Sequence, residues 1–280
     1  MSKKWPALAD RLSLEQKYFI NRVVKSARYF PIDTYFHYKH RAEKMLPLPP
    51  VTLRHRVSGV DDIGYFHYTG LSSHDDFQKA LNLAGYEMSQ FRSILDFGAG
   101  CGRIMRWMKQ YSPPAELYGT DIDIPAIRWS QKKLTFATFD INQPLPPLVY
   151  PANQFDYIYS HSVFTHLDDT YQDAWLAELN RVTKPGAILT LTVHGKHAFD
   201  HYISNAPDVP IIHEQHQHYQ QKGFLFVSQD SWQGIFPAFY RTMFHQESYV
   251  RQHWSDYFEV LNYIDQGMLN YQAIVVLRKR

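Results

Sequence analysis

The chain has 280 residues, of which 45% are hydrophobic and 20% charged, and its formal net charge is +2. This composition indicates a globular protein rather than a disordered one, and the balanced charge disfavours nucleic acid as a partner. The single cysteine, Cys101, excludes a disulfide within the chain and a zinc site built from several cysteines.

Targeting signals are not evident. The first residues, MSKKWPALAD, contain no apolar core of a signal peptide, and no run approaches the roughly 20 apolar residues that cross a bilayer. We therefore expect a soluble, cytoplasmic protein without a transmembrane segment, and leave a peripheral membrane role open.

Residues 1–90 are expected to form a helical and irregular N-terminal extension. Three apolar residues of the first helix recur four apart on one face: Phe19, Val23 and Ala27. The elements expected here are a helix at 14–29, an irregular segment at 31–72, and a helix at 75–84 with Ser73 as its N-cap.

From residue 91 onward, short apolar runs alternate with amphipathic helical patterns. Such alternation predicts a parallel sheet covered by helices on both faces. Strands are expected at 93–97, 116–120, 134–139, 155–160 and 187–193, with helices at 103–111, from Pro125 onward, and at 169–182.

The C-terminal part departs from this alternation. Runs at 258–263 and 271–277 are joined by a short loop with Gly267 and Asn270, which predicts an antiparallel hairpin at the sheet edge. Residues 196–255 are too long for a simple crossover, and we expect them to form an insert over the strand ends.

A glycine-rich turn follows the first predicted strand, in the stretch LDFGAGCGR at 95–103. Gly98, Gly100 and Gly102 are typical of a turn that approaches a ligand and starts a helix. Dinucleotide-binding turns need a small residue where this chain has Arg103, so a pyrophosphate ligand is disfavoured.

Acidic residues end the next two predicted strands. Asp121 can accept hydrogen bonds from both hydroxyls of a ribose, and Asp140 can receive the amino group of an adenine. Ile122 and Ile141 follow them and could enclose the faces of the base. These residues predict a ligand that carries a nucleoside but no pyrophosphate.

The motifs LDFGAGCGR, YGTDID, FDINQ, FDYIYSHSVFTHL and RVTKPGAILTLTVHG, in this order, resemble those of class I S-adenosylmethionine-dependent methyltransferases. The C-terminal YQAIVVLRK is similar to the last strand of that fold. The resemblance covers about 90–196 and 256–280. It implies an α/β, Rossmann-like, seven-stranded and mostly parallel sheet with one antiparallel C-terminal strand, in a methyltransferase domain at 91–280.

The resemblance also implies S-adenosylmethionine as cofactor and a set of residues that bind it. These are Asp96, Gly98, Ala99, Gly100, Gly102, Arg103, Asp121, Ile122, Asp140, Ile141, Ser160 and His161. Among them Arg103 could reach the carboxylate of the cofactor, and Ser160 and His161 would lie near the sulfonium.

Methyl transfer needs an aligned nucleophile, whereas a general base is optional. His161 and His194 follow the fourth and fifth predicted strands and are candidate bases, and His245 in the insert is a more remote one. The stretch HEQHQH at 213–218 misses the H-E-x-x-H metal motif, and we expect no metal.

The function expected from these observations is methyl transfer to an oxygen or nitrogen of a small-molecule or glycan-like acceptor. The aromatic insert at 196–255 would build the acceptor pocket. The alternatives are an RNA or protein methyltransferase and a non-catalytic module that binds S-adenosylmethionine. The oligomeric state and the role of residues 1–70 stay open.

Overall fold

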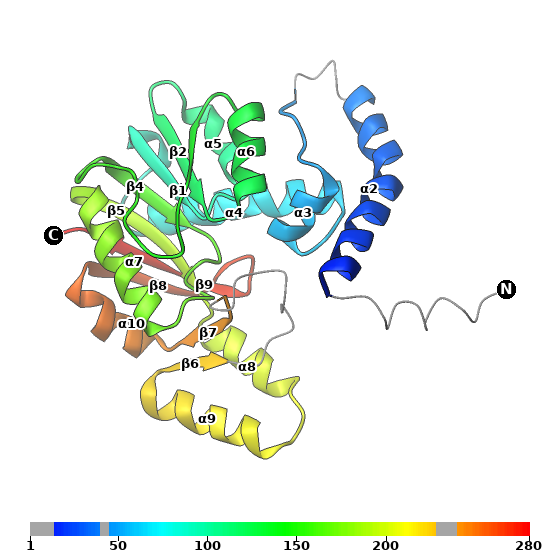
Figure 1. Ribbon diagram of the computed structural model, residues 1–280. Coiled ribbons are helices and arrows are strands. Elements are labelled where there is room, and N and C mark those ends of the chain that lie inside the picture. Colours follow the sequence, from blue (N-terminus) through cyan, green and yellow to red (C-terminus); the bar gives the residue numbers. More distant parts are fainter. Residues whose placement is uncertain (1–13, 40–44, 228–239) are drawn as a thin grey trace.

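A computed structural model describes residues 14–39, 45–227 and 240–280 (Figure 1). At its centre lies a seven-stranded sheet with the strand order β3-β2-β1-β4-β5-β9-β8. The strands are β1 (Ser93–Phe97), β2 (Glu116–Asp121), β3 (Thr138–Ile141), β4 (Phe155–Ser160), β5 (Thr183–Val193), β8 (Glu259–Met268) and β9 (Gln272–Arg278).

The first five strands of this sheet pair in parallel, whereas β9 runs antiparallel between β5 and β8. The predicted Rossmann-like sheet with an antiparallel C-terminal strand is thereby confirmed. Because the chain order reverses between β1 and β4, their carboxyl ends form the crevice in which ligands of open α/β sheets bind.

Helices cover both faces of the sheet. Neighbouring residues of β1 point to opposite faces, so Ile94 and Leu95 belong to two different apolar clusters. The first face is covered by α4 (Ile63–Leu83), α5 (Met105–Met108) and α6 (Ile124–Lys133), and the second by α7 (Asp169–Val182) and α10 (Glu247–His253).

The N-terminal extension is more helical than its sequence predicts. It forms α2 (Leu14–Lys39), α3 (Val51–Ser58) and α4, so the irregular segment expected at 31–72 is wrong. Helix α4 begins at Asp62, whose side chain accepts a hydrogen bond from the Tyr65 amide, and not at Ser73. The Ser73 hydroxyl instead donates to the Thr69 carbonyl one turn earlier, a contact that makes serine compatible with a helix interior.

The apolar face predicted for the first helix does not point into the core. Val23 and Ala27 are exposed, and the partly buried residues of α2, such as Phe36, lie on the opposite side. Phe19 lies in this helix, but its side chain is outside the described residues. The periodic pattern therefore identified an apolar face correctly, but this face does not pack against the rest of the described chain.

The third strand is displaced from its predicted position of 134–139. The structure places β3 at Thr138–Ile141, and Leu134 instead follows the end of α6 and packs against Gly102. A short apolar run fits either a strand or a buried helix end, because periodicity alone does not separate them. By contrast, β1, β4 and α7 have the predicted boundaries.

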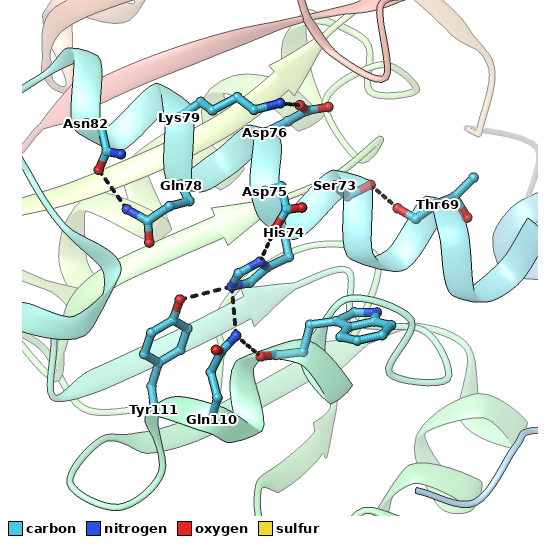
Figure 2. A network of polar contacts seen from close by, with 11 residues as sticks. Thr69, Ser73, His74, Asp75, Asp76, Gln78, Lys79, Asn82, Gln110 and Tyr111 are labelled. Atoms are coloured by element: carbon cyan, nitrogen blue, oxygen red, sulfur yellow. Dashed lines mark hydrogen bonds and ion pairs between the residues drawn. The ribbon is translucent and has the colours of Figure 1, made fainter. Parts of the chain in front are cut away.

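Helix α4 is fixed against the segment that follows the glycine-rich turn. Figure 2 shows His74 pointing from α4 to two residues of this segment, with its Nε2 at 3.1 Å from the Tyr111 hydroxyl and 3.3 Å from the Gln110 amide nitrogen. The Asp75 carboxylate accepts a hydrogen bond from the other ring nitrogen of His74 at 2.9 Å. These hydrogen bonds connect α4 to the sheet domain.

The insert after β5 contains α8 (Lys196–Ser204), α9 (Pro210–Lys222), β6 (Phe224–Val227), β7 (Thr242–His245) and α10. Strands β6 and β7 form a second, two-stranded sheet with its own small apolar cluster. The Met243 amide donates to the Thr165 carbonyl and the His245 amide to the His194 carbonyl, both at 2.8 Å. These bonds hold β7 at the carboxyl ends of β4 and β5.

Candidate functional site

A cavity of about 480 Å³ opens at the carboxyl ends of the parallel strands. Its walls come from α3, the turns after β1 and β2, residues 141–144 after β3, residues 161–163 after β4, and Tyr240 of the insert. A cavity of this size falls within the range of small-molecule and cofactor sites.

The glycines of the turn after β1 adopt left-handed conformations, with φ of +91° at Gly98, +52° at Gly100 and +73° at Gly102. Each also faces a close neighbour, because an added Cβ would meet Val163, Val57 or Leu134, respectively. At each of these glycines the backbone therefore lies too close to a neighbouring side chain for a Cβ atom to fit without a shift. Gly98 and Gly100 line the cavity, and Gly102 does not.

Asp121 lies at the end of β2 with its carboxylate held by two backbone amides. The Gly100 amide donates to Oδ2 and the Asp123 amide to Oδ1, both at 2.8 Å. Burial raises the pKa of Asp121 despite these bonds. Each oxygen keeps a further lone pair, so the carboxylate can still accept from two hydroxyl groups of a ribose.

At the other side of the turn, Asp96 and Arg103 lie in the same wall of the cavity. Burial raises the pKa of Asp96 to about 7, and the positive charge of Arg103 opposes that rise. Arg103 donates to His161 Nδ1 at 3.1 Å and to the Ser73 hydroxyl at 3.4 Å, but its buried Nε has no hydrogen-bond partner among the described residues. A buried guanidinium in this state suits a ligand carboxylate, and the neighbouring Asp96 suits an ammonium group.

Residues after β3 form another part of the cavity wall. Ile141, Asn142 and Gln143 line it, whereas the Asp140 carboxylate accepts a hydrogen bond from the Tyr150 hydroxyl at 3.1 Å and does not line it. The cavity thus combines acceptors for a ribose, apolar residues for a flat base, and paired charges for an amino acid. This donor and acceptor set matches S-adenosylmethionine, which contains those three parts.

Comparison with known proteins agrees with this assignment. A family model described as "Methyltransferase domain" matches residues 95–191, which include the glycine-rich turn and the ends of β2, β3 and β4. Residues 95–191 are thus a methyltransferase domain, and the seven-stranded sheet around them is the one expected for class I S-adenosylmethionine-dependent methyltransferases.

Similar methyltransferases are known from several organisms. An uncharacterized methyltransferase of Schizosaccharomyces pombe is 35% identical over 104 residues, which are 33% of this chain and 36% of that protein. The ubiquinone/menaquinone biosynthesis C-methyltransferase UbiE of Burkholderia cenocepacia is 30% identical over 112 residues, or 39% of this chain and 45% of that one. The alignments therefore span less than half of either relative.

Two solved structures share the fold of this chain. The PH0226 protein of Pyrococcus horikoshii has a TM-score of 0.51 at 17% identity, with 74% of this chain and 90% of that chain covered. A methyltransferase described as SAM-dependent from Aquifex aeolicus has a TM-score of 0.50 at 15% identity, with coverages of 83% and 100%.

The structure brings nine of the twelve predicted cofactor residues of the methyltransferase into the cavity wall. Gly102, Asp140 and Ser160 are the exceptions. Ser160 is fully buried, and its hydroxyl donates to the Phe97 carbonyl at 2.7 Å. The nine residues in the wall are Asp96, Gly98, Ala99, Gly100, Arg103, Asp121, Ile122, Ile141 and His161.

Several lining residues were missed from the sequence. Arg56 and Val57 come from α3, and no motif in the sequence connects α3 with the methyltransferase domain. Arg56 forms an ion pair with Asp123 at 3.0 Å across this edge of the cavity. Asn142 and Gln143 follow Ile141 directly, so the FDINQ motif contained a signal that could have identified them.

Of the three candidate bases, one is hydrogen-bonded to Arg103 and the other two do not line the cavity. His161 lines the cavity, but its Nδ1 accepts from Arg103, and burial together with that charge lowers its pKa well below the ordinary value. His194 does not line the cavity; its Nδ1 donates to the Met243 carbonyl at 3.2 Å, and burial lowers its pKa to about 3.

His245 is fully buried beneath the insert and likewise does not line the cavity. Its Nε2 donates to the Gln172 side-chain oxygen at 2.8 Å, and burial lowers its pKa to about 3. Its interactions are those of a core histidine that connects β7 to α7.

Two further features of the methyltransferase sequence can be located. The HEQHQH stretch lies in α9, where His213 contacts Asp208 at 2.7 Å. Across the described part of the chain, no helix has the length and apolarity required to cross a membrane.

Proposed function

We propose that the protein transfers a methyl group from S-adenosylmethionine to a small-molecule acceptor, at an oxygen or nitrogen atom. The observation that carries the proposal is the joint placement of Asp96, Arg103 and Asp121 around one cavity at the carboxyl ends of β1 and β2. When bound there, the cofactor supplies an electrophilic methyl group on a sulfonium.

The residues of this chain would hold and orient the cofactor. Asp121 would accept from the ribose hydroxyls, Arg103 would donate to the carboxylate, and Asp96 would pair with the ammonium group. Gln143 lines the cavity whereas Asp140 does not, so Gln143 rather than Asp140 would meet the edge of the adenine.

The surroundings of the cavity bear on the class of acceptor. Its wall includes the apolar side chains of Val163, Leu167 and Trp175 and the ring of Tyr240. Such a lining favours a small molecule with an apolar part over a polynucleotide. The formal charge of +2 for the whole chain supports the same choice.

The hydrogen bond between His161 and Arg103 bears on which acceptor atoms are favoured. It is the one histidine among the described residues of the cavity wall, and its Nδ1 is already bonded to Arg103. Without a free histidine base in the wall, an acceptor that is nucleophilic before any proton leaves is favoured, namely a carboxylate oxygen or an unprotonated nitrogen.

A carbon acceptor is a second candidate, because UbiE, which is similar over 112 residues, is by its name a C-methyltransferase. The two candidates predict different products. Incubation of the protein and a cell extract with S-adenosylmethionine carrying a ¹³C-methyl group, followed by NMR of the labelled product, distinguishes O-, N- and C-methyl groups.

The same experiment tests the proposal against its alternatives. We expect the label in the small-molecule fraction. Label recovered in RNA or protein would replace the proposed acceptor class, and cofactor binding without any labelled product would indicate a non-catalytic binding module.

A further inference from the structure

Helix α2 has a continuous apolar face that points to solvent. Exposed apolar residues recur every three or four positions along it, which places them on one side of the helix. They are Ile20, Val23, Val24, Ala27, Phe30, Pro31, Tyr35 and Tyr38. Phe30 is 71% exposed, Tyr35 65% and Tyr38 79%, and the face extends over about 27 Å of helix.

The opposite side of α2 holds the helix to the protein. Asp33 accepts two hydrogen bonds from the fully buried Arg54 of α3, at 2.9 and 3.1 Å, and Lys25 contacts Asp61 at 3.1 Å. Phe36 packs against the cluster formed by α3 and α4. In Figure 1, α2 lies beyond α3 on the side away from the sheet.

The charge of the chain is distributed unevenly along the sequence. Residues 1–44 contain ten Lys and Arg against four Asp and Glu, a net charge of +6, and the remaining 236 residues have a net charge of −4. An exposed apolar face with aromatic residues, set in a basic segment, has the composition of a helix that lies in the interface of an anionic bilayer.

We propose that α2 docks on an anionic lipid surface through its apolar face, with Phe30, Tyr35 and Tyr38 inserted at the level of the headgroups. A second copy of the chain is a less favourable occupant, since two segments of charge +6 would have to approach each other. The helix is long enough to span a bilayer but not apolar enough, so the inference concerns a surface contact.

The test is co-sedimentation of the full chain with vesicles of equal parts phosphatidylglycerol and phosphatidylcholine, and with vesicles of phosphatidylcholine alone. We expect binding to the anionic vesicles, weaker binding to the neutral ones, and release as the salt concentration approaches 1 M. The double variant Phe30→Glu/Tyr35→Glu should bind the anionic vesicles at least about tenfold more weakly.

Val149→Glu is the matched control, because Val149 is an equally exposed apolar residue outside α2, at 71%. It should bind vesicles like the wild type. Thermal unfolding of both variants verifies that they fold, and light scattering reports the oligomeric state.

Failure of the wild type to bind anionic vesicles would overturn the inference, as would unchanged binding by the double variant. A wild-type dimer that the double variant converts to monomers, without vesicle binding, would assign the face to a second copy. None of these three outcomes bears on methyl transfer, because the inference does not rest on the proposed function.

Discussion

Asp121 and Asp140 end neighbouring strands and occur in similar sequence contexts, but their side chains have different surroundings. Asp121 is held by the Gly100 and Asp123 amides at the cavity wall, whereas Asp140 faces the hydroxyl of Tyr150. Both were expected to contact the cofactor. At the scale of single residues, therefore, the strand end predicts where an acid lies, and its neighbours decide what it can bind.

We expect Asp121→Ala to weaken the binding of S-adenosylhomocysteine by about tenfold to a hundredfold, because hydrogen bonds to a buried carboxylate are lost. Isothermal titration calorimetry measures this change. Asp140→Ala is the matched control and should alter the affinity by no more than about twofold. Equal losses in both variants would contradict the assignment of Asp121 alone to the ribose.

The raised pKa of Asp96 predicts how the binding of S-adenosylhomocysteine depends on pH. Its pKa is raised to about 7 by burial, so the carboxyl is protonated below that pH and loses its attraction for the ammonium of S-adenosylhomocysteine. The dissociation constant should rise toward about tenfold per pH unit below pH 7, measured by calorimetry between pH 5.5 and 7.5. Asp96→Asn should bind weakly with little pH dependence; a retained dependence would assign the titration to another group.

At the scale of elements, α4 and α5 approach each other at a glycine. A Cβ at Gly70 would meet the carbonyl oxygen of Arg103 and lie 2.8 Å from Trp107 Nε1. This contact places the backbone of Arg103 and thereby the guanidinium in the cavity wall.

Gly70→Ala should lower the free energy of unfolding by about 1–3 kcal/mol, because backbone atoms cannot move aside as a flexible side chain can. Denaturant unfolding measures the change. Gly64→Ala in the same helix is the control: its Cβ would lie 3.2 Å from a side-chain oxygen of Asp62, and we expect a change within about 0.5 kcal/mol. If Gly70→Ala is as stable as Gly64→Ala, α4 and α5 are not in tight contact.

Elements with a clear local pattern were predicted well. The apolar run of β1 and the stripe of α7 have the expected boundaries, since each buries one recurrent set of side chains. The extension was predicted poorly, because α3 and the first turns of α4 are stabilised by packing against the domain and by contacts such as those of Arg54. Contacts of this kind leave no periodic signal.

At the scale of the whole molecule, the cavity joins segments far apart in the chain, from Val57 of α3 to Tyr240 of the insert. Ligand binding should therefore stabilise the extension as well as the glycine-rich turn. Amide hydrogen exchange measured with saturating S-adenosylhomocysteine should be slower in residues 51–58 and 97–104 than in the free protein. Helix α9, which does not line the cavity, is the control and should exchange at an unchanged rate. Unchanged exchange in 51–58 would show that α3 does not close over the ligand.

The sequence by itself determined the sheet domain and its cofactor class, and it predicted nine residues that line the cavity. These properties follow from local signals: alternating strand and helix patterns, a glycine-rich turn, and acids at strand ends. Only the tertiary structure decided that Asp140 and Gly102 do not line the cavity, that His194 and His245 are buried outside it, and that α3 supplies part of its wall. It also decided that the apolar face of α2 is exposed. The reason is physical, because the direction of a side chain depends on partners that are distant in the chain and come together only on folding.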